Sequence, residues 1–129
     1  MRPLAMTAYC IASSLGAGVA PTLSALRRGE SGLRPCRFET VDLPTYVGEI
    51  PGLDDWRLEE PLGRLDCRNN RLARLALAQD GFEQAVGAAK TRYGASRIGV
   101  FLGTSTAGIL EIEQAWRRRG ADGSLPSDF

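Results

Sequence analysis

The stretch that most constrains the fold is Arg97–Leu110, because it joins a short apolar run to small residues and then to a helical pattern. The run Ile98–Leu102 lies between a basic residue and a glycine, which is typical of a strand buried on both faces. Small and hydroxylic residues follow over Gly103–Gly108, and a helix is expected from Ala107 to Arg119. In open α/β sheets a turn of this kind lies at the carboxyl end of a strand, where ligands bind. The apolar positions of the expected helix are Ile109, Ile112 and Trp116.

The remaining chain alternates strand-like and helical patterns, which predicts an α/β fold with a parallel-rich sheet and flanking helices. Two or three strands make a thin sheet, so the pattern is that of part of a larger domain. The expected elements before this stretch begin with a strand over Leu4–Ala12, a turn over Ser13–Gly18 and a helix over Val19–Arg28, followed by a left-handed Gly29. An irregular insert over residues 33–66 comes next, with a short edge strand at Tyr46–Ile50. One helix is then expected over Cys67–Tyr93, capped by Asn70 and ended by Gly94.

The absence of histidine from all 129 residues is the main chemical constraint on function. It removes the commonest general base and the commonest metal ligand, and it excludes a Ser-His or Cys-His pair within this chain. The cysteines Cys10, Cys36 and Cys67 are too widely and unevenly spaced for a disulfide framework or a zinc site. Cys67 precedes Arg68 near a helix start, a setting that favours a thiolate, but no base accompanies it. Free cysteines favour a cytoplasmic location.

The net charge and the length of the apolar runs exclude two further classes of function, nucleic-acid binding and membrane association. The net charge is +1, so no strong field attracts nucleic acid or an anionic membrane, and no apolar run is long enough to span a bilayer. Arg117–Arg119 are interpreted as a solvated helix end, where the helix dipole favours cations. The acidic residues of the insert are interpreted as solvent-facing charge; they are Asp54, Asp55, Glu59 and Glu60.

The turn Gly103–Gly108 has two interpretations. Backbone N–H groups at a helix N-terminus bind anions, so the turn could cradle a phosphate. However, the lysine of a nucleotide-binding loop is missing and the three-glycine dinucleotide spacing is not met. The favoured interpretation is a tight turn whose small residues allow close packing of helix against strand.

Several segments, in order along the chain, resemble the opening of β-ketoacyl-acyl-carrier-protein synthases. Thr7–Gly16 (TAYCIASSLG) resembles the first strand and its Ser-Leu-Gly turn, and Leu26–Pro35 (LRRGESGLRP) the segment after the first helix. Tyr46–Ile50 (YVGEI) is similar to a short Ala-Gly-Glu strand of the family. Arg71–Ala78 (RLARLALA) is similar to its next helix, and Gly99–Ser105 (GVFLGTS) to a later strand and turn.

The resemblance implies a thiolase fold, of which residues 1–129 would be an incomplete N-terminal half of the N-terminal domain. The family's nucleophilic cysteine and two histidines would lie further along, so no catalytic residue, metal or cofactor is expected in this chain. Thr106 would align with the wall of the family's acyl pocket, and Thr104 and Ser105 would flank it. Two departures from the family pattern are Asn70 in place of aspartate and Ser105 in place of glycine.

The implied parent is an acyltransferase of fatty acid or polyketide-type biosynthesis that condenses an acyl thioester with malonyl-carrier protein. Its expected partners are acyl carrier protein and a second subunit of the same fold, in a homodimer or heterodimer, with no nucleic acid and no membrane. Two alternatives remain open. One is a non-catalytic subunit that sets chain length, and the other is a small α/β binding domain with its ligand site at the turn after Leu102.

Overall fold

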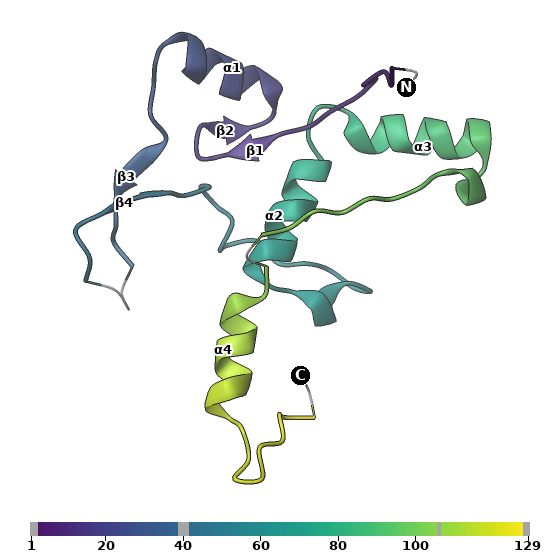
Figure 1. The fold of residues 1–129 in the computed structure, drawn as a ribbon. Coiled ribbons are helices and arrows are strands. Elements are labelled where there is room, and N and C mark those ends of the chain that lie inside the picture. Colours follow the sequence, from purple (N-terminus) through teal and green to yellow (C-terminus); the bar gives the residue numbers. More distant parts are fainter. Residues whose placement is uncertain (1–2, 39–41, 106, 128–129) are drawn as a thin grey trace. The chain divides into compact units, whose positions relative to one another are not determined.

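The computed structural model describes residues 3–38, 42–105 and 107–127, and the chain divides into two compact units, Met1–Ile98 and Gly99–Phe129. The elements are those of a small α/β protein, with four α-helices and two small antiparallel sheets in the described residues (Figure 1). The expected parallel-rich sheet is not seen among them, since both sheets are two-stranded and antiparallel.

The first unit begins with a tight hairpin that leads into a helix. β1 (Ala12–Ser13) pairs with β2 (Gly16–Ala17), and α1 (Val19–Arg27) follows. The Thr22 hydroxyl donates to the Gly18 carbonyl at 2.8 Å, which satisfies a polar group that is only 6% exposed. Gly29 ends the helix at φ 66°, as the sequence predicts.

A second hairpin lies beside the first. β3 (Leu33–Pro35) pairs with β4 (Tyr46–Gly48), so a short strand begins at Tyr46 as expected but ends two residues before Ile50. Gly32 and Gly48 meet the turn of the first hairpin at Ser14, and a Cβ on Gly32 would lie 2.6 Å from the Ser14 carbonyl carbon. The two hairpins therefore approach each other so closely that glycine is required at position 32.

The expected single helix over Cys67–Tyr93 is wrong, because the structure has two helices there. After the 3-10 turn η1 (Gly63–Leu65), α2 covers Arg68–Leu77 and α3 covers Phe82–Tyr93. Asp80 at φ 58° and Gly81 at φ 71° are left-handed, which breaks the helix. Asn70 is not the cap; its side-chain amide donates to the Leu65 carbonyl at 2.8 Å, and Cys67 occupies the cap position.

The expected first strand is absent from the described residues before Ala12. Leu4 and Met6 are 99% and 81% exposed and form no ladder. The expected buried strand over Ile98–Leu102 is also absent. The run Ile98–Leu102 has no strand structure and comes directly after a 3-10 turn, η2 (Ala95–Arg97). Within the run, the side chain of Phe101 is 97% exposed. An apolar run becomes a buried strand only when a neighbouring strand and a covering layer are present, and within residues 3–38, 42–105 and 107–127 this run pairs with no strand.

Among its described residues, the second unit contains one helix. α4 (Ile109–Arg117) confirms the helix expected after the turn, and Gly108 precedes it at φ 75°. Ala115 on this helix is completely buried, while Trp116 is 57% exposed. In the first unit the buried apolar side chains of the described residues are Ala25 and Leu53. Among the residues that the structure describes, burial is therefore confined to a few side chains, and most large apolar side chains remain accessible to solvent.

Candidate functional site

The turn before α4 is where the sequence predicts ligand-facing residues. Thr104 and Ser105 lie there and are exposed, whereas Thr106 lies outside the described residues. The helix has no side-chain cap, and Glu111 occupies its first turn. A carboxylate at this end competes with an anionic ligand for the positive end of the helix dipole. The local chemistry therefore favours the tight-turn interpretation over a phosphate cradle.

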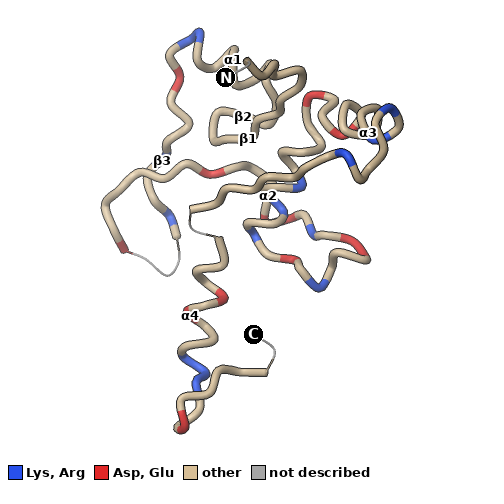
Figure 2. The backbone as a smooth tube through the Cα atoms, turned by 45° about the vertical axis from the view of Figure 1, so that its right-hand side comes forward, with Lys and Arg blue, Asp and Glu red and all other residues tan. Residues whose placement is uncertain are grey.

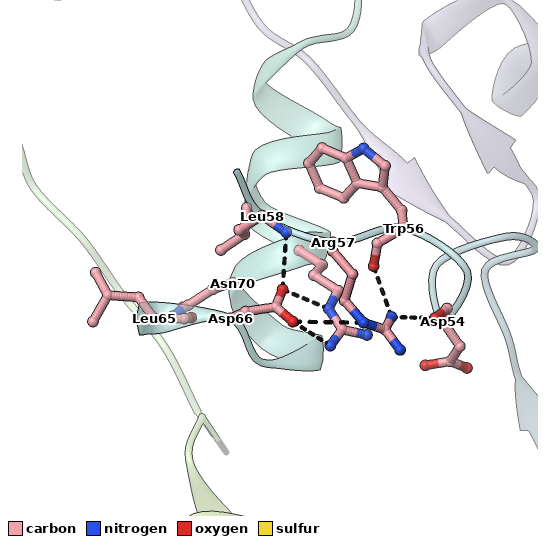
Figure 3. A network of polar contacts seen from close by, with 8 residues as sticks. Asp54, Trp56, Arg57, Leu58, Leu65, Asp66 and Asn70 are labelled. Carbon is pink, nitrogen blue, oxygen red and sulfur yellow. Dashed lines mark hydrogen bonds and ion pairs between the residues drawn. The ribbon is translucent and has the colours of Figure 1, made fainter. Parts of the chain in front are cut away.

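The best-organised polar cluster lies in the first unit, around Asp66 (Figure 3). Its carboxylate accepts hydrogen bonds from Arg71 Nε at 2.8 Å and Nη2 at 2.6 Å, and from the Leu58 N–H at 3.0 Å. The side chains of Asp66 and Arg71 are only 18% and 13% exposed. Hydrogen bonding from Arg71, and next from Leu58, lowers the pKa of the Asp66 carboxyl from 3.8 to about 2.

Neighbouring contacts fasten the insert to the start of α2. Arg57 lies 3.8 Å from the second carboxylate oxygen of Asp66 and donates to the Trp56 carbonyl at 2.9 Å. Arg68 pairs with Asp54 at 3.1 Å. Because the carboxylate of Asp66 is already held by several donors, it is an anchor of the insert and is poorly placed to accept a proton in catalysis.

The sequence patterns considered above do not predict this cluster. A signal for it was present, because Asp66 stands directly before the expected helix start and Arg71 stands five residues later. The acidic residues interpreted from the sequence as solvent-facing charge are exposed in the structure; they are Asp54, Asp55, Glu59 and Glu60.

A surface cavity of about 650 Å³ lies between the second hairpin, the loop that follows β4 and the start of α2. Its charged lining mixes both signs, and Phe38 and Ile50 add apolar surface. Figure 2 likewise shows basic and acidic residues interspersed along the insert. Because opposite charges offset one another, the cavity has no strong preference for an anion or a cation. The charged residues are Arg34, Arg37, Arg68, Glu49, Asp54 and Asp55.

The cysteines offer no assembled reactive centre. Cys10, Cys36 and Cys67 are each half-buried and free. No group of three or more metal-ligating side chains occurs in the described parts of the chain. The lack of histidine leaves each of these cysteines without an imidazole base from this chain.

None of the helices over residues 3–38, 42–105 and 107–127 has the length and apolar character needed to cross a bilayer. No protein-family model, curated protein or solved structure matches this chain.

Proposed function

We propose that this chain is the N-terminal part of a β-ketoacyl-acyl-carrier-protein synthase, with scaffold and pocket-wall roles and no catalytic residue of its own. The observation that carries the proposal is the ordered succession of family-like segments from Thr7 to Ser105. The local structure of two of these segments supports the proposal. The segment Tyr46–Ile50 begins with the strand β4, and the segment Arg71–Ala78 lies on the helix α2 and ends one residue beyond it.

The chemistry of the described residues is consistent with this role. A condensing reaction needs a thiolate that takes the acyl chain and donors that stabilise the enolate formed when malonyl-carrier protein loses CO₂. This chain has no histidine, and its three cysteines are free thiols. The proposal therefore assigns the reacting groups to a continuation of the chain and assigns to Thr104–Thr106 contact with the acyl chain.

The decisive experiment is to read the coding sequence beyond the codon for Phe129 and to assay the complete product in the cytoplasmic fraction. We expect a cysteine in a small-residue turn, followed by two histidines, and formation of ketoacyl product from acyl- and malonyl-carrier protein. An open reading frame of this form with another residue at the nucleophile position would identify a non-catalytic partner subunit. A frame without these motifs would refute the proposal.

The pocket assignment has its own test in the complete enzyme. Ser105→Phe adds volume to an exposed turn residue, so it should leave folding intact and shorten the longest acyl chain that is accepted. Ser96→Phe makes the same change at an exposed position on η2 and should leave product length unchanged. Mass spectrometry of the products measures both. Equal product lengths in the two variants would remove Ser105 from the pocket wall.

A further inference from the structure

Two small surface cavities in the first unit meet at Trp56. Their volumes are about 330 Å³ and about 240 Å³, and Trp56 and Arg74 line both of them. The larger cavity is bounded by the turn that follows Trp56, over residues 58–62, and the smaller one by the C-terminal end of α2. Pockets for small ligands begin at about 300 Å³, so the two cavities suit a small molecule better than a segment of another protein.

The lining of the larger cavity carries excess negative charge. Glu59 and Glu60 line it, and both are exposed. Within the part of the chain that the structure describes, neither of them forms an ion pair. Arg74 pairs with Glu83, so its positive charge is already offset. A Cβ built on Gly63 would lie 2.8 Å from Glu60 Oε1, so the glycine leaves room for this carboxylate beside the turn. The cavity therefore favours a cation over an anion.

The smaller cavity adds partial negative charge from a helix end. Ala78, the C-cap residue of α2, lines it together with Leu75 and Gln79. The aligned peptide dipoles of a helix leave a partial negative charge at the C-terminal end, which attracts cations. The glutamates and the helix end belong to different segments of the first unit, yet both favour the same sign of charge beside Trp56.

Trp56 supplies an aromatic face to both cavities. It is 39% exposed, and Figure 3 shows its indole ring turned away from the Asp66 carboxylate, so the Asp66 cluster does not use the ring. Tryptophan is the aromatic side chain that attracts cations most strongly. The ring of the other tryptophan, Trp116, already has the Arg119 guanidinium 5.0 Å from its centre. Among the described residues, no cation lies over the ring of Trp56 in this way.

We propose that the two cavities at Trp56 bind a small organic cation, an alkyl or quaternary ammonium group on a short hydrocarbon body. The ammonium group lies over the indole ring, between the carboxylates of Glu59 and Glu60 and the C-terminal end of α2. Leu62 and Leu75 contact the hydrocarbon body. The site uses none of the residues assigned to the acyl pocket, so it is independent of the proposed condensing role.

Ligand-observed NMR with choline tests the site in the complete product of the reading frame that encodes this chain. Saturation transfer should reach the choline methyl protons, and binding should be weak and should fall at high salt, because the carboxylates are exposed. The uncharged tert-butyl analogue of choline has nearly the same shape and should bind about tenfold more weakly. Equal binding of the two probes, or no detectable transfer to choline, would overturn the proposal.

A matched pair of double variants separates the site from the general effect of negative charge. Glu59→Gln combined with Glu60→Gln should weaken choline binding about tenfold. Glu49→Gln combined with Asp55→Asn removes the same charge from exposed residues elsewhere in the first unit and should leave binding nearly unchanged. Circular dichroism verifies that both variants are folded. Equal losses in the two double variants would show that the carboxylates at Trp56 form no site.

A second pair tests the aromatic face. Trp56→Leu keeps an apolar side chain but removes the ring, and it should weaken choline binding about tenfold. Trp116→Leu removes the tryptophan whose ring already carries an arginine and should leave binding unchanged. If Trp56→Leu binds choline as tightly as Trp116→Leu does, the proposal is wrong.

Discussion

The prediction that tests the fold most directly concerns Asp80, which caps a helix from a distant part of the chain. The Val19 N–H, in the first turn of α1, donates to Asp80 Oδ1 at 2.9 Å, although the two residues are 61 positions apart. The N-cap residue Gly18 has no side chain that could accept this bond. Asp80 itself is left-handed at φ 58°, a conformation that aspartate and asparagine tolerate better than alanine.

Three substitutions separate the two effects at this position. Asp80→Ala removes the cap, which costs about 1 kcal/mol, and also places alanine in the left-handed region, which costs about 1 kcal/mol more. Asp80→Gly removes the cap but adopts the same backbone angle without strain, so we expect a loss of about 1 kcal/mol. Asp80→Asn keeps an acceptor and the backbone preference and loses only the charge–dipole interaction, about 0.5 kcal/mol at low salt.

The assay is urea unfolding followed by circular dichroism, with hydrogen exchange of the Val19 amide as the local readout. The free energy of unfolding should fall in the order wild type, Asp80→Asn, Asp80→Gly, Asp80→Ala. The difference between wild type and Asp80→Asn should vanish at high salt. If Asp80→Asn destabilises as much as Asp80→Ala, or if Val19 exchange does not respond to any of the three, the capping contact is refuted.

Three further predictions concern single substitutions in the first unit. Gly32→Ala should lower the free energy of unfolding by about 1–3 kcal/mol, measured by urea unfolding, because its Cβ would meet the backbone of Ser14. Gly87→Ala should raise the stability of α3 by up to about 1 kcal/mol, measured by helical circular dichroism, because nothing lies within 4 Å of the new Cβ. Arg71→Gln should raise the pKa of Asp66 from about 2 toward its ordinary value of 3.8, measured by carbon NMR of the carboxyl group.

The lowered pKa of Asp66 also predicts how the stability of the fold depends on pH. Because the carboxyl pKa is lower in the folded chain than in the unfolded chain, the ion pair stabilises the fold above about pH 4, and this contribution is lost as the pH falls toward about 2. Arg64→Gln removes the same charge from an exposed residue and should leave the titration of Asp66 unchanged. A wild-type titration at the ordinary value, or equal shifts in the two glutamine variants, would contradict the hydrogen-bonded pair.

Several features could be predicted from the sequence because near neighbours along the chain determine them. The bounds of α1 follow from the helical spacing of its apolar residues and from Gly29, whose missing Cβ permits a left-handed end. β4 is signalled by its short apolar and aromatic run. The sequence also contains a signal for the break between α2 and α3, since Asp80-Gly81 is a turn dipeptide, although apolar residues such as Leu75 and Phe82 lie at helical spacing on both sides of it.

Only the tertiary structure decided the rest, because those features depend on partners that local sequence does not specify. The cap on Val19 comes from Asp80, and the glycine at position 32 is required by Ser14 in another hairpin. The run Val100–Leu102 has the composition of a buried strand yet is exposed. Backbone preference and periodicity act between residues a few positions apart, whereas a strand's ladder, a helix cap and a close glycine contact arise only where distant segments meet in space.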